Sequence, residues 1–355
     1  MAGALALLAL SLSACGTTAP PSAPSASASA LAAARTPVPS TFVASRSSRN
    51  GATTRVELVS SDSGRVVRVL ATAGPSFTDN GLARSPDGRY VYATWIGPSS
   101  LLVERIPAAG GAPVVVAGGE EPAPSPNGRF LADVTGPGGQ VVAVRDLASG
   151  RTRRWDLGPV MGPGRSLLAG YLTWVADGSE LVAMPQPDPV AAGTANSATT
   201  DGPPGAANTA TTAAAGPAGV QPACGTVSSS TQCLVAFDPS SPRPVIHTEV
   251  VPLPGVDVTG LFSGGTAAPR AVLVVGAVRG GDDVIERVQV GQPGTTAVRV
   301  ARGPIMALAV DPSGTRLLYL VGSSPPVLWR GTLRSGRLVD TRRLVADPRF
   351  GAVAW

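Results

Sequence analysis

The stretch Leu82-Ala-Arg-Ser-Pro-Asp-Gly-Arg-Tyr-Val-Tyr-Ala-Thr-Trp95 decides the fold, because it joins two apolar strands through one tight turn. Three further segments repeat the pattern: Pro124–Asp133, Leu172–Ala183 and Leu308–Leu320. Proline holds φ near the value that the second position of a type I turn requires. The following Asp or Asn can bond back to the backbone, and glycine accepts the left-handed conformation that closes the turn. Each segment therefore predicts a β-hairpin.

We assign the turn residues a structural role and no catalytic one. They are Pro86, Asp87, Gly88, Pro126, Asn127, Gly128, Asp177, Gly178, Pro312 and Gly314. Asp87 and Asn127 lie 40 residues apart, and Asp177 follows after 50 more. Such a period is typical of four short strands in each unit.

The repeats resemble the TolB-like and WD40-like β-propeller repeats of bacterial envelope proteins, over residues 41–355. The resemblance implies an all-β propeller, and it says little about function, because one fold serves many functions. Five units are expected at 79–118, 121–158, 166–252, 255–300 and 303–346.

The sixth unit joins the two ends of the chain. Strands within 41–73 would pair with Phe350-Gly-Ala-Val-Ala-Trp355, which reads like the strand that elsewhere precedes the turn. That pairing closes the ring and removes its open edges. The turn of the unit at 255–300 is degenerate (Ser263-Gly-Gly-Thr266), so five or seven blades stay open as alternatives to six.

The amino-terminal residues predict an address outside the cytoplasm. The apolar run Leu5–Leu12 is too short to span a bilayer and fits a signal peptide, residues 1–14. The tetrapeptide Leu12-Ser-Ala-Cys15 resembles the bacterial lipobox, which implies a diacylglycerol anchor on Cys15. Residues 15–40 then form an Ala/Ser/Pro-rich tether to the outer face of the cell membrane. An uncleaved apolar terminus with an incidental cysteine is the alternative.

The composition agrees with a folded all-β protein. Gly (43) and Pro (35) are abundant, yet 43% of the residues are hydrophobic, so the chain has enough apolar side chains for a core. All 28 basic residues are arginine, a bias that suggests an actinobacterium. The net charge of +5 suits anionic headgroups or wall polymers, and the predicted compartment argues against nucleic acid.

The two remaining cysteines predict a disulfide. Cys224 and Cys233 lie nine residues apart, and outside the cytoplasm such a pair is most simply oxidised. Residues 187–222 read as a disordered insertion, whose base this disulfide would clip.

Candidate chemistry is sparse. The single histidine, His247, lies in an alternating strand pattern, and no Gly-x-Ser-x-Gly motif is present. Asp282, Asp283 and Glu286 could bind Ca²⁺, although a solvated hairpin tip is the simpler interpretation. We predict no cofactor and a non-enzymatic binding or scaffold module for a protein or cell-envelope polymer. The alternative is a propeller that binds a small molecule in its central funnel, and a metal-assisted hydrolase or lyase comes third.

Overall fold

The computed structural model describes most of the region after residue 38. The described residues are 39–74, 78–97, 101–136, 139–162, 164–187, 224, 231–241, 246–252, 256–263, 265, 270–278, 283–290, 295–301, 305–322, 325–334, 337–346 and 349–355. The predicted signal peptide, Cys15, nearly all of the tether and nearly all of the insertion lie outside them.

Six four-stranded antiparallel sheets make up the fold. In spatial order blade 1 holds β24 (Phe350–Ala354), β1 (Thr41–Ser47), β2 (Thr54–Ser60) and β3 (Val66–Ala73). Blade 2 holds β4 (Thr78–Arg84), β5 (Tyr90–Ile96), β6 (Leu101–Pro107) and β7 (Val114–Ala117). Blade 3 holds β8 (Glu120–Pro124), β9 (Phe130–Thr135), β10 (Val141–Asp146) and β11 (Thr152–Asp156).

The remaining blades follow in chain order. Blade 4 holds β12 (Arg165–Trp174), β13 (Leu181–Pro187), β14 (Thr231–Phe237) and β15 (Ile246–Pro252). Blade 5 holds β16 (Val256–Ser263), β17 (Ala271–Val278), β18 (Asp283–Gln289) and β19 (Thr295–Ala301). Blade 6 holds β20 (Ile305–Val310), β21 (Arg316–Val321), β22 (Val327–Arg334) and β23 (Arg337–Ala346).

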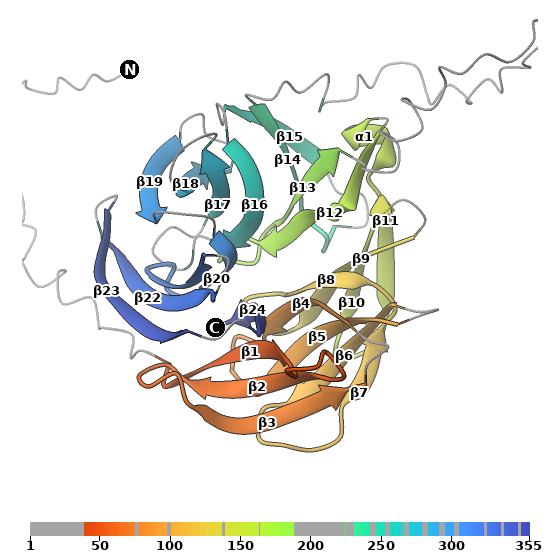
Figure 1. Ribbon diagram of the computed structural model, residues 1–355. Coiled ribbons are helices and arrows are strands. Elements are labelled where there is room, and N and C mark those ends of the chain that lie inside the picture. Colours follow the sequence, from red (N-terminus) through yellow and green to blue (C-terminus); the bar gives the residue numbers. More distant parts are fainter. Residues whose placement is uncertain are drawn as a thin grey trace, which may run out of the picture. The chain divides into compact units, whose positions relative to one another are not determined.

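The blades stand around a common centre, with the first strand of each nearest the middle (Figure 1). This is a six-bladed β-propeller, so the predicted fold class and blade number are confirmed. The alternatives of five and seven blades are wrong. The degenerate segment at Ser263 still forms the end of an inner strand, β16, and the blade count is unchanged.

The two ends of the described chain meet in blade 1. Strand β24 pairs antiparallel with β1, with Val43 opposite Ala354 and Ala44 opposite Val353. Val43 and Ala44 are fully buried, and Val353 is 6% exposed. Phe350, Val353 and Trp355 pack in a cluster with blade 6 residues such as Leu318 and Leu328. The predicted closure of the ring by terminal strands is therefore confirmed.

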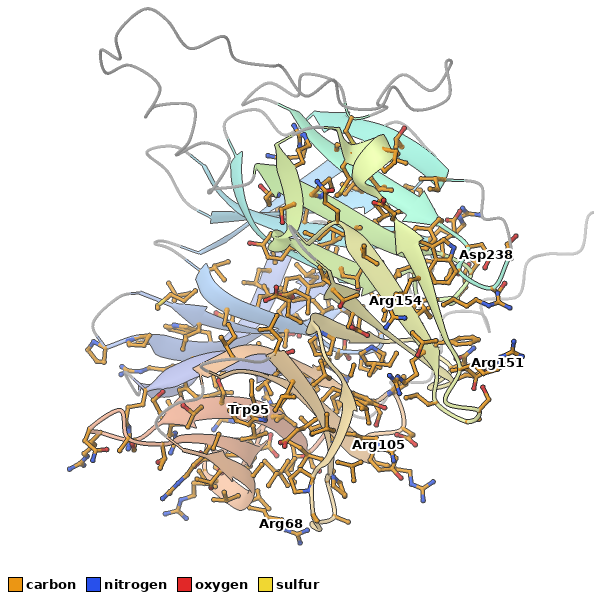
Figure 2. The ribbon with its side chains drawn as sticks, turned by 90° about the vertical axis from the view of Figure 1, so that its right-hand side faces the viewer. Arg68, Trp95, Arg105, Arg151, Arg154 and Asp238 are labelled. Carbon is orange, nitrogen blue, oxygen red and sulfur yellow. A yellow bond between two sulfur atoms is a disulfide. The ribbon has the colours of Figure 1, made fainter. Side chains whose placement is uncertain are left out.

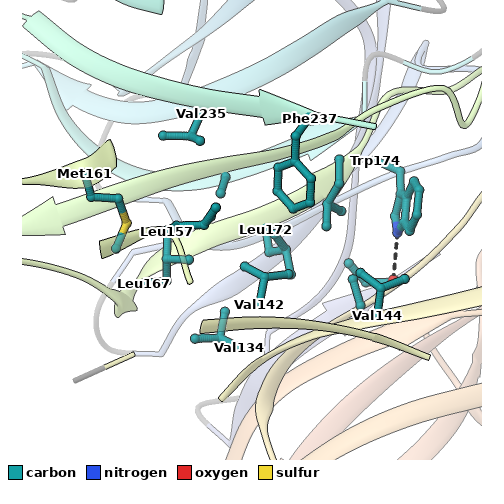
Figure 3. Packing of buried hydrophobic residues seen from close by; sticks show 14 of the residues in the cluster. Val134, Val142, Val144, Leu157, Met161, Leu167, Leu172, Trp174, Val235 and Phe237 are labelled. Atoms are coloured by element: carbon teal, nitrogen blue, oxygen red, sulfur yellow. Dashed lines mark hydrogen bonds between the residues drawn. The ribbon is translucent and has the colours of Figure 1, made fainter. Parts of the chain in front are cut away.

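The core is a series of apolar clusters, several of them formed between neighbouring blades. Figure 3 shows the cluster where Val134, Val142 and Val144 of blade 3 meet Leu172 and Phe237 of blade 4. A buried hydrogen bond crosses the same junction, because Trp174 Nε1 donates to the Ala123 carbonyl at 2.9 Å. Alternating strand residues supply both faces of each blade, so every blade is apolar on two sides.

Cys224 and Cys233 form the predicted disulfide, with their Cα atoms 5.5 Å apart. Both are buried in the cluster between blades 3 and 4. Strand β14 begins at Thr231, so Cys233 lies within the strand. The helix α1 (Gly158–Met161) precedes β12, and no helix among the described residues is long and apolar enough to cross a membrane.

Ring closure predicts a large difference between two matched substitutions in blade 1. Val353→Asp places an unpaired carboxylate at the buried β24–β1 junction and should lower the free energy of unfolding by at least about 3 kcal/mol. Val67→Asp, on β3 at 58% exposure, should cost under about 0.5 kcal/mol. Denaturant unfolding of both variants measures this, and equal losses would mean that closure contributes little.

Candidate functional site

A cavity of 770 Å³ lies within the ring of inner strands. Its lining comes from all six blades, through the strands β24, β4, β8, β12, β16 and β20. Leu82, Leu172 and Leu308 give it an apolar wall, and Met306 is the most exposed large apolar side chain on an inner strand, at 56%. Cavities of this size and character hold small ligands or short segments of larger ones. We call this cavity the central channel.

One end of the channel is bordered by the hairpin turns. In the blade 2 turn, the Gly88 N–H donates to the Ser85 carbonyl at 2.8 Å, and Gly88 adopts φ 69°. Ser85 Oγ and the Arg89 N–H both donate to Asp87 Oδ1, at 2.6 and 3.0 Å. These hydrogen bonds hold the pKa of the Asp87 carboxyl below its usual range, with the Ser85 bond contributing most.

The other predicted turns have the same geometry. Gly128, Gly178 and Gly314 all adopt φ between 68° and 74° and donate to the carbonyl three residues earlier. The turns also do something that the sequence did not indicate, because Pro86, Asp87, Gly88, Pro126 and Pro312 line the channel. We call this border the turn rim.

The blade 5 turn meets its neighbour at the rim. Gly265 adopts φ 70°, and a Cβ there would lie 2.0 Å from the backbone nitrogen of Gly314. A backbone contact that close leaves no room for any side chain. Glycine at position 265 is thus what lets the chain of blade 5 come this close to the blade 6 turn.

Every inner strand carries a bulge or register shift against its neighbour. In β20 the shift falls between Ile305 and Ala307, and in β8 between Glu120 and Ala123. The same irregularity recurs in β4, β12, β16 and along the β24–β1 pair. A bulge turns a side chain out of the regular alternation. We call these positions the bulge ring.

The bulge ring places particular side chains in the channel. Met306 is the extra residue of β20 and lines the cavity, which explains its exposure. Glu121 lies in the β8 bulge with φ 54°, a conformation that non-glycine residues seldom adopt. Burial, and next the nearby Glu121 charge, raise the pKa of Tyr171 to about 12, so Tyr171 stays neutral and its hydroxyl keeps its proton.

Arg84 is the positively charged residue of the lining. It ends β4, and its Nη1 donates to the Thr41 carbonyl of blade 1 at 2.8 Å. Its Nε is enclosed and has no hydrogen-bond partner. Burial lowers the pKa of the Arg84 guanidinium from its ordinary value. Arg84 therefore carries a partly desolvated charge at the turn rim.

Asp133 is a second notable carboxyl, outside the channel lining. It lies on β9 opposite the β8 bulge, is 3% exposed, and faces the space between blades 2 and 3. A Cβ on Gly119 would come within 2.3 Å of Asp133 Oδ2, so glycine leaves room for the carboxyl. Burial raises the pKa of Asp133 to about 7, against the opposing influence of Arg145 and Arg154.

The other sequence candidates lie away from the channel. His247 is in β15, an outermost strand, and Asp283 and Glu286 are in β18; for these three the description covers the backbone only. Asp282 lies outside the described residues. Within the described parts of the chain, no group of three or more His, Cys, Asp or Glu side chains could hold a metal ion. Figure 2 shows Arg68, on the outermost strand β3, and Arg151, just before β11, at the periphery of the propeller.

Comparison with solved structures supports the fold. TolB from Acinetobacter baumannii superposes with a TM-score of 0.60 at 11% identity, over 89% of this chain and 66% of that one. The likeness is that of a TolB-like propeller. This chain thus spans slightly less than two thirds of the TolB chain, and at such low identity the likeness shows the fold alone.

Other propellers resemble it less. The Swd1 propeller of Myceliophteria thermophila gives a TM-score of 0.49 at 15% identity over 88% of this chain and 89% of that one. Hydrazine synthase of Kuenenia stuttgartiensis gives 0.46 at 15% identity over 81% and 75%. No protein-family model matches the sequence, and no curated protein does. The function of this propeller therefore has to be inferred from its own residues.

The contact between turns predicts that two glycines respond differently to alanine. Both Gly265 and Gly128 adopt positive φ, so alanine at either position costs about 1–2 kcal/mol of backbone strain. Gly128 has open space around its Cβ position, whereas Gly265 faces the Gly314 backbone. Gly265→Ala should therefore destabilise the protein clearly more than Gly128→Ala in denaturant unfolding. Equal effects would show that the turns of blades 5 and 6 do not need this contact.

Asp133 predicts a pH dependence of stability. Its folded pKa of about 7 exceeds its ordinary value of 3.8, so its contribution is most favourable in acid and is lost as the pH rises through about 7. Asp133→Asn should remove this loss and raise the free energy of unfolding at about pH 8 by at most about 4 kcal/mol. The measurement is denaturant unfolding across the pH range.

The matched control is Asp146→Asn in the same blade. Hydrogen bonds, first from the Ser149 N–H, lower the pKa of the partly buried Asp146 carboxyl. Its contribution is lost only as the pH falls below the ordinary range, so this variant should keep the wild-type slope between about pH 5 and 8. A wild-type slope in Asp133→Asn would contradict the assignment.

Proposed function

We propose that this protein is a non-enzymatic binding module, held at the outer face of the cell membrane by a lipid on Cys15. Its partner is an envelope protein or cell-envelope polymer, part of which docks at the turn rim of the central channel. The observation that carries the proposal is the channel itself, a largely apolar cavity of 770 Å³ that the turn rim borders at one end.

The composition of the lining favours binding over catalysis. The lining includes no histidine and no cysteine among the described residues. Of the three acidic lining residues, Asp87 and Asp311 are engaged in hydrogen bonds within their own turns, and Glu121 also has an interaction partner. General acid–base catalysis needs a titratable group that is free to exchange a proton with a substrate. A preformed apolar cavity with a few fixed polar groups suits recognition instead.

The membrane tether is supported by the sequence. The apolar run Leu5–Leu12 and the tetrapeptide ending at Cys15 resemble the apolar region and the lipobox of a lipoprotein signal peptide, although no Lys or Arg precedes the run. Two acyl chains anchor a protein stably, whereas one does so only marginally. A tether of about 25 residues would then hold the propeller roughly 25–30 Å from the membrane surface, within reach of neighbouring envelope components.

A small molecule is the second candidate partner. The specific observation in its favour is the size of the channel, which falls inside the usual range of about 300–1,000 Å³ for small-molecule sites. Residues of all six blades line the channel, so one ligand can contact several blades at once.

Crosslinking in the native host tests the proposal. The full-length protein is crosslinked in cells, and captured molecules are identified by mass spectrometry. We expect a dominant envelope partner with the wild type, and loss of that partner when Cys15→Ala releases the protein from the membrane. A second variant, Met306→Trp, fills the channel from an exposed position and should weaken the capture without unfolding the protein.

The outcomes separate the two candidates. Capture that survives Cys15→Ala would overturn the role of the anchor, and capture that survives Met306→Trp would overturn the role of the channel. Efficient crosslinking with no captured macromolecule would overturn the macromolecular partner and favour the small molecule. Ligands of the native state raise the melting temperature, so a thermal-shift screen of wall fragments and sugars then follows.

A further inference from the structure

We infer that the central channel selects a ligand with one anionic group, bound by Arg84 at the turn rim, and an uncharged apolar body that extends toward the bulge ring. The inference rests on the proposed binding role of the channel and names the chemistry of its occupant. Three features of the lining carry it: the state of Arg84, the engagement of the nearby carboxylates, and the apolar wall.

The first feature is the incomplete set of partners around Arg84. The described residues offer its guanidinium one hydrogen-bond acceptor, the Thr41 carbonyl at 2.8 Å. Guanidinium groups carry five N–H donors in a planar fork that fits carboxylate and phosphate oxygens. An enclosed positive charge without an opposite charge is costly, and an arriving anion relieves that cost.

The guanidinium borders the channel. Arg84 is half-buried and packs against the turn glycine Gly88, where an added Cβ would lie 3.1 Å from Arg84 Nη2. Both Arg84 and Gly88 line the channel. An anion at the rim can therefore approach Nη2 without displacing the Thr41 contact.

The second feature is that two rim carboxylates are already engaged. Asp87 accepts hydrogen bonds from Ser85 Oγ and the Arg89 N–H. Asp311, 2% exposed, accepts from Ser313 Oγ at 2.7 Å and from the Arg316 N–H at 3.0 Å. The Arg316 guanidinium lies 3.6 Å from its other oxygen. These acids hold their turns together, and neither forms an ion pair with Arg84 among the described contacts.

The third feature is the uncharged lining around Arg84. Arg84 lies four residues before the turn glycine Gly88, and the residues in the same position before Gly128, Gly178 and Gly314 are Pro124, Trp174 and Val310. All of them line the channel, and none carries a charge. A single cation in an otherwise uncharged level of the ring binds a single anionic group and leaves the rest of the ligand against apolar side chains.

The anion can come from a free small molecule or from the carboxyl end of a peptide, and the test separates these sources. Calorimetric titration of the full-length protein uses 4-phenylbutanoate and its neutral amide as the first pair. An acetylated alanyl-leucyl-phenylalanine, as free acid and as amide, forms the second pair. We expect at least one acid to bind about tenfold or more tightly than its amide, as charge-assisted hydrogen bonds provide.

Arg84→Gln is the central variant, and Arg89→Gln is its matched control. Arg89 is exposed on the same turn and outside the channel lining, so both variants lose the same charge. Arg84→Gln should erase the preference for acid over amide, and Arg89→Gln should retain it. Because Arg84 contacts Thr41, a second pair guards against misfolding: Met306→Glu adds an anion at an exposed lining position, and Met306→Gln adds none. Only Met306→Glu should weaken binding of the acid.

Each outcome decides the inference. Acids and amides that bind equally, an unchanged preference in folded Arg84→Gln, equal effects of the two Met306 variants, or no binding by any acid would overturn it. The crosslinking experiment tests the proposed function separately from the anion site. A captured partner together with failure of the acid probes would remove the anion assignment and leave the binding module. Arg84-dependent acid binding without a captured partner would remove the macromolecular partner and leave the site.

Discussion

The pairing of β24 with β1 is the constraint on which the rest of the structure depends. It brings residues from opposite ends of the described chain into one sheet, with Ala44 opposite Val353. Once the ring closes, blade 1 packs on both blade 6 and blade 2, and no blade is left with an apolar face in water. Closure also fixes where the six inner strands converge. The channel is thus a consequence of the ring, and no blade could form it alone.

Each inner strand lies at the edge of its sheet, with a neighbouring strand on one side only. Unpaired edges invite other strands, and proteins protect them by bulges that interrupt a regular ladder. The bulge ring places that protection on the channel side of all six blades. The same irregularity turns Met306 and Glu121 toward the cavity. The bulges that protect the strand edges therefore also place in the channel side chains that differ from blade to blade.

The sequence predicted the hairpins, the blade count and the closing strand, because these depend on local signals. An Asp, Asn or Pro followed by a glycine specifies a turn within a few residues, and four copies of the hairpin pattern along the chain favour a propeller. The channel residues were missed for a physical reason. A bulge has no composition of its own, and Arg84 becomes notable only when Thr41 of another blade encloses it. The turn prolines were assigned to structure alone, because nothing local indicates that Pro126 and Pro312 share one rim.

A repeated scaffold offers the same environment six times, so its specificity has to come from the positions where the repeats differ. Along the turn rim, Arg84 occupies a position held elsewhere by Pro124, Trp174 and Val310. In the bulge ring, Glu121 occupies the position held by Gly81, Tyr171 and Ala307. Packing does not demand either charge, because the other blades fold with uncharged residues there. A single cation at one level of an otherwise apolar channel gives the channel a direction, so a ligand with one anionic group and an apolar body is expected to bind in one orientation.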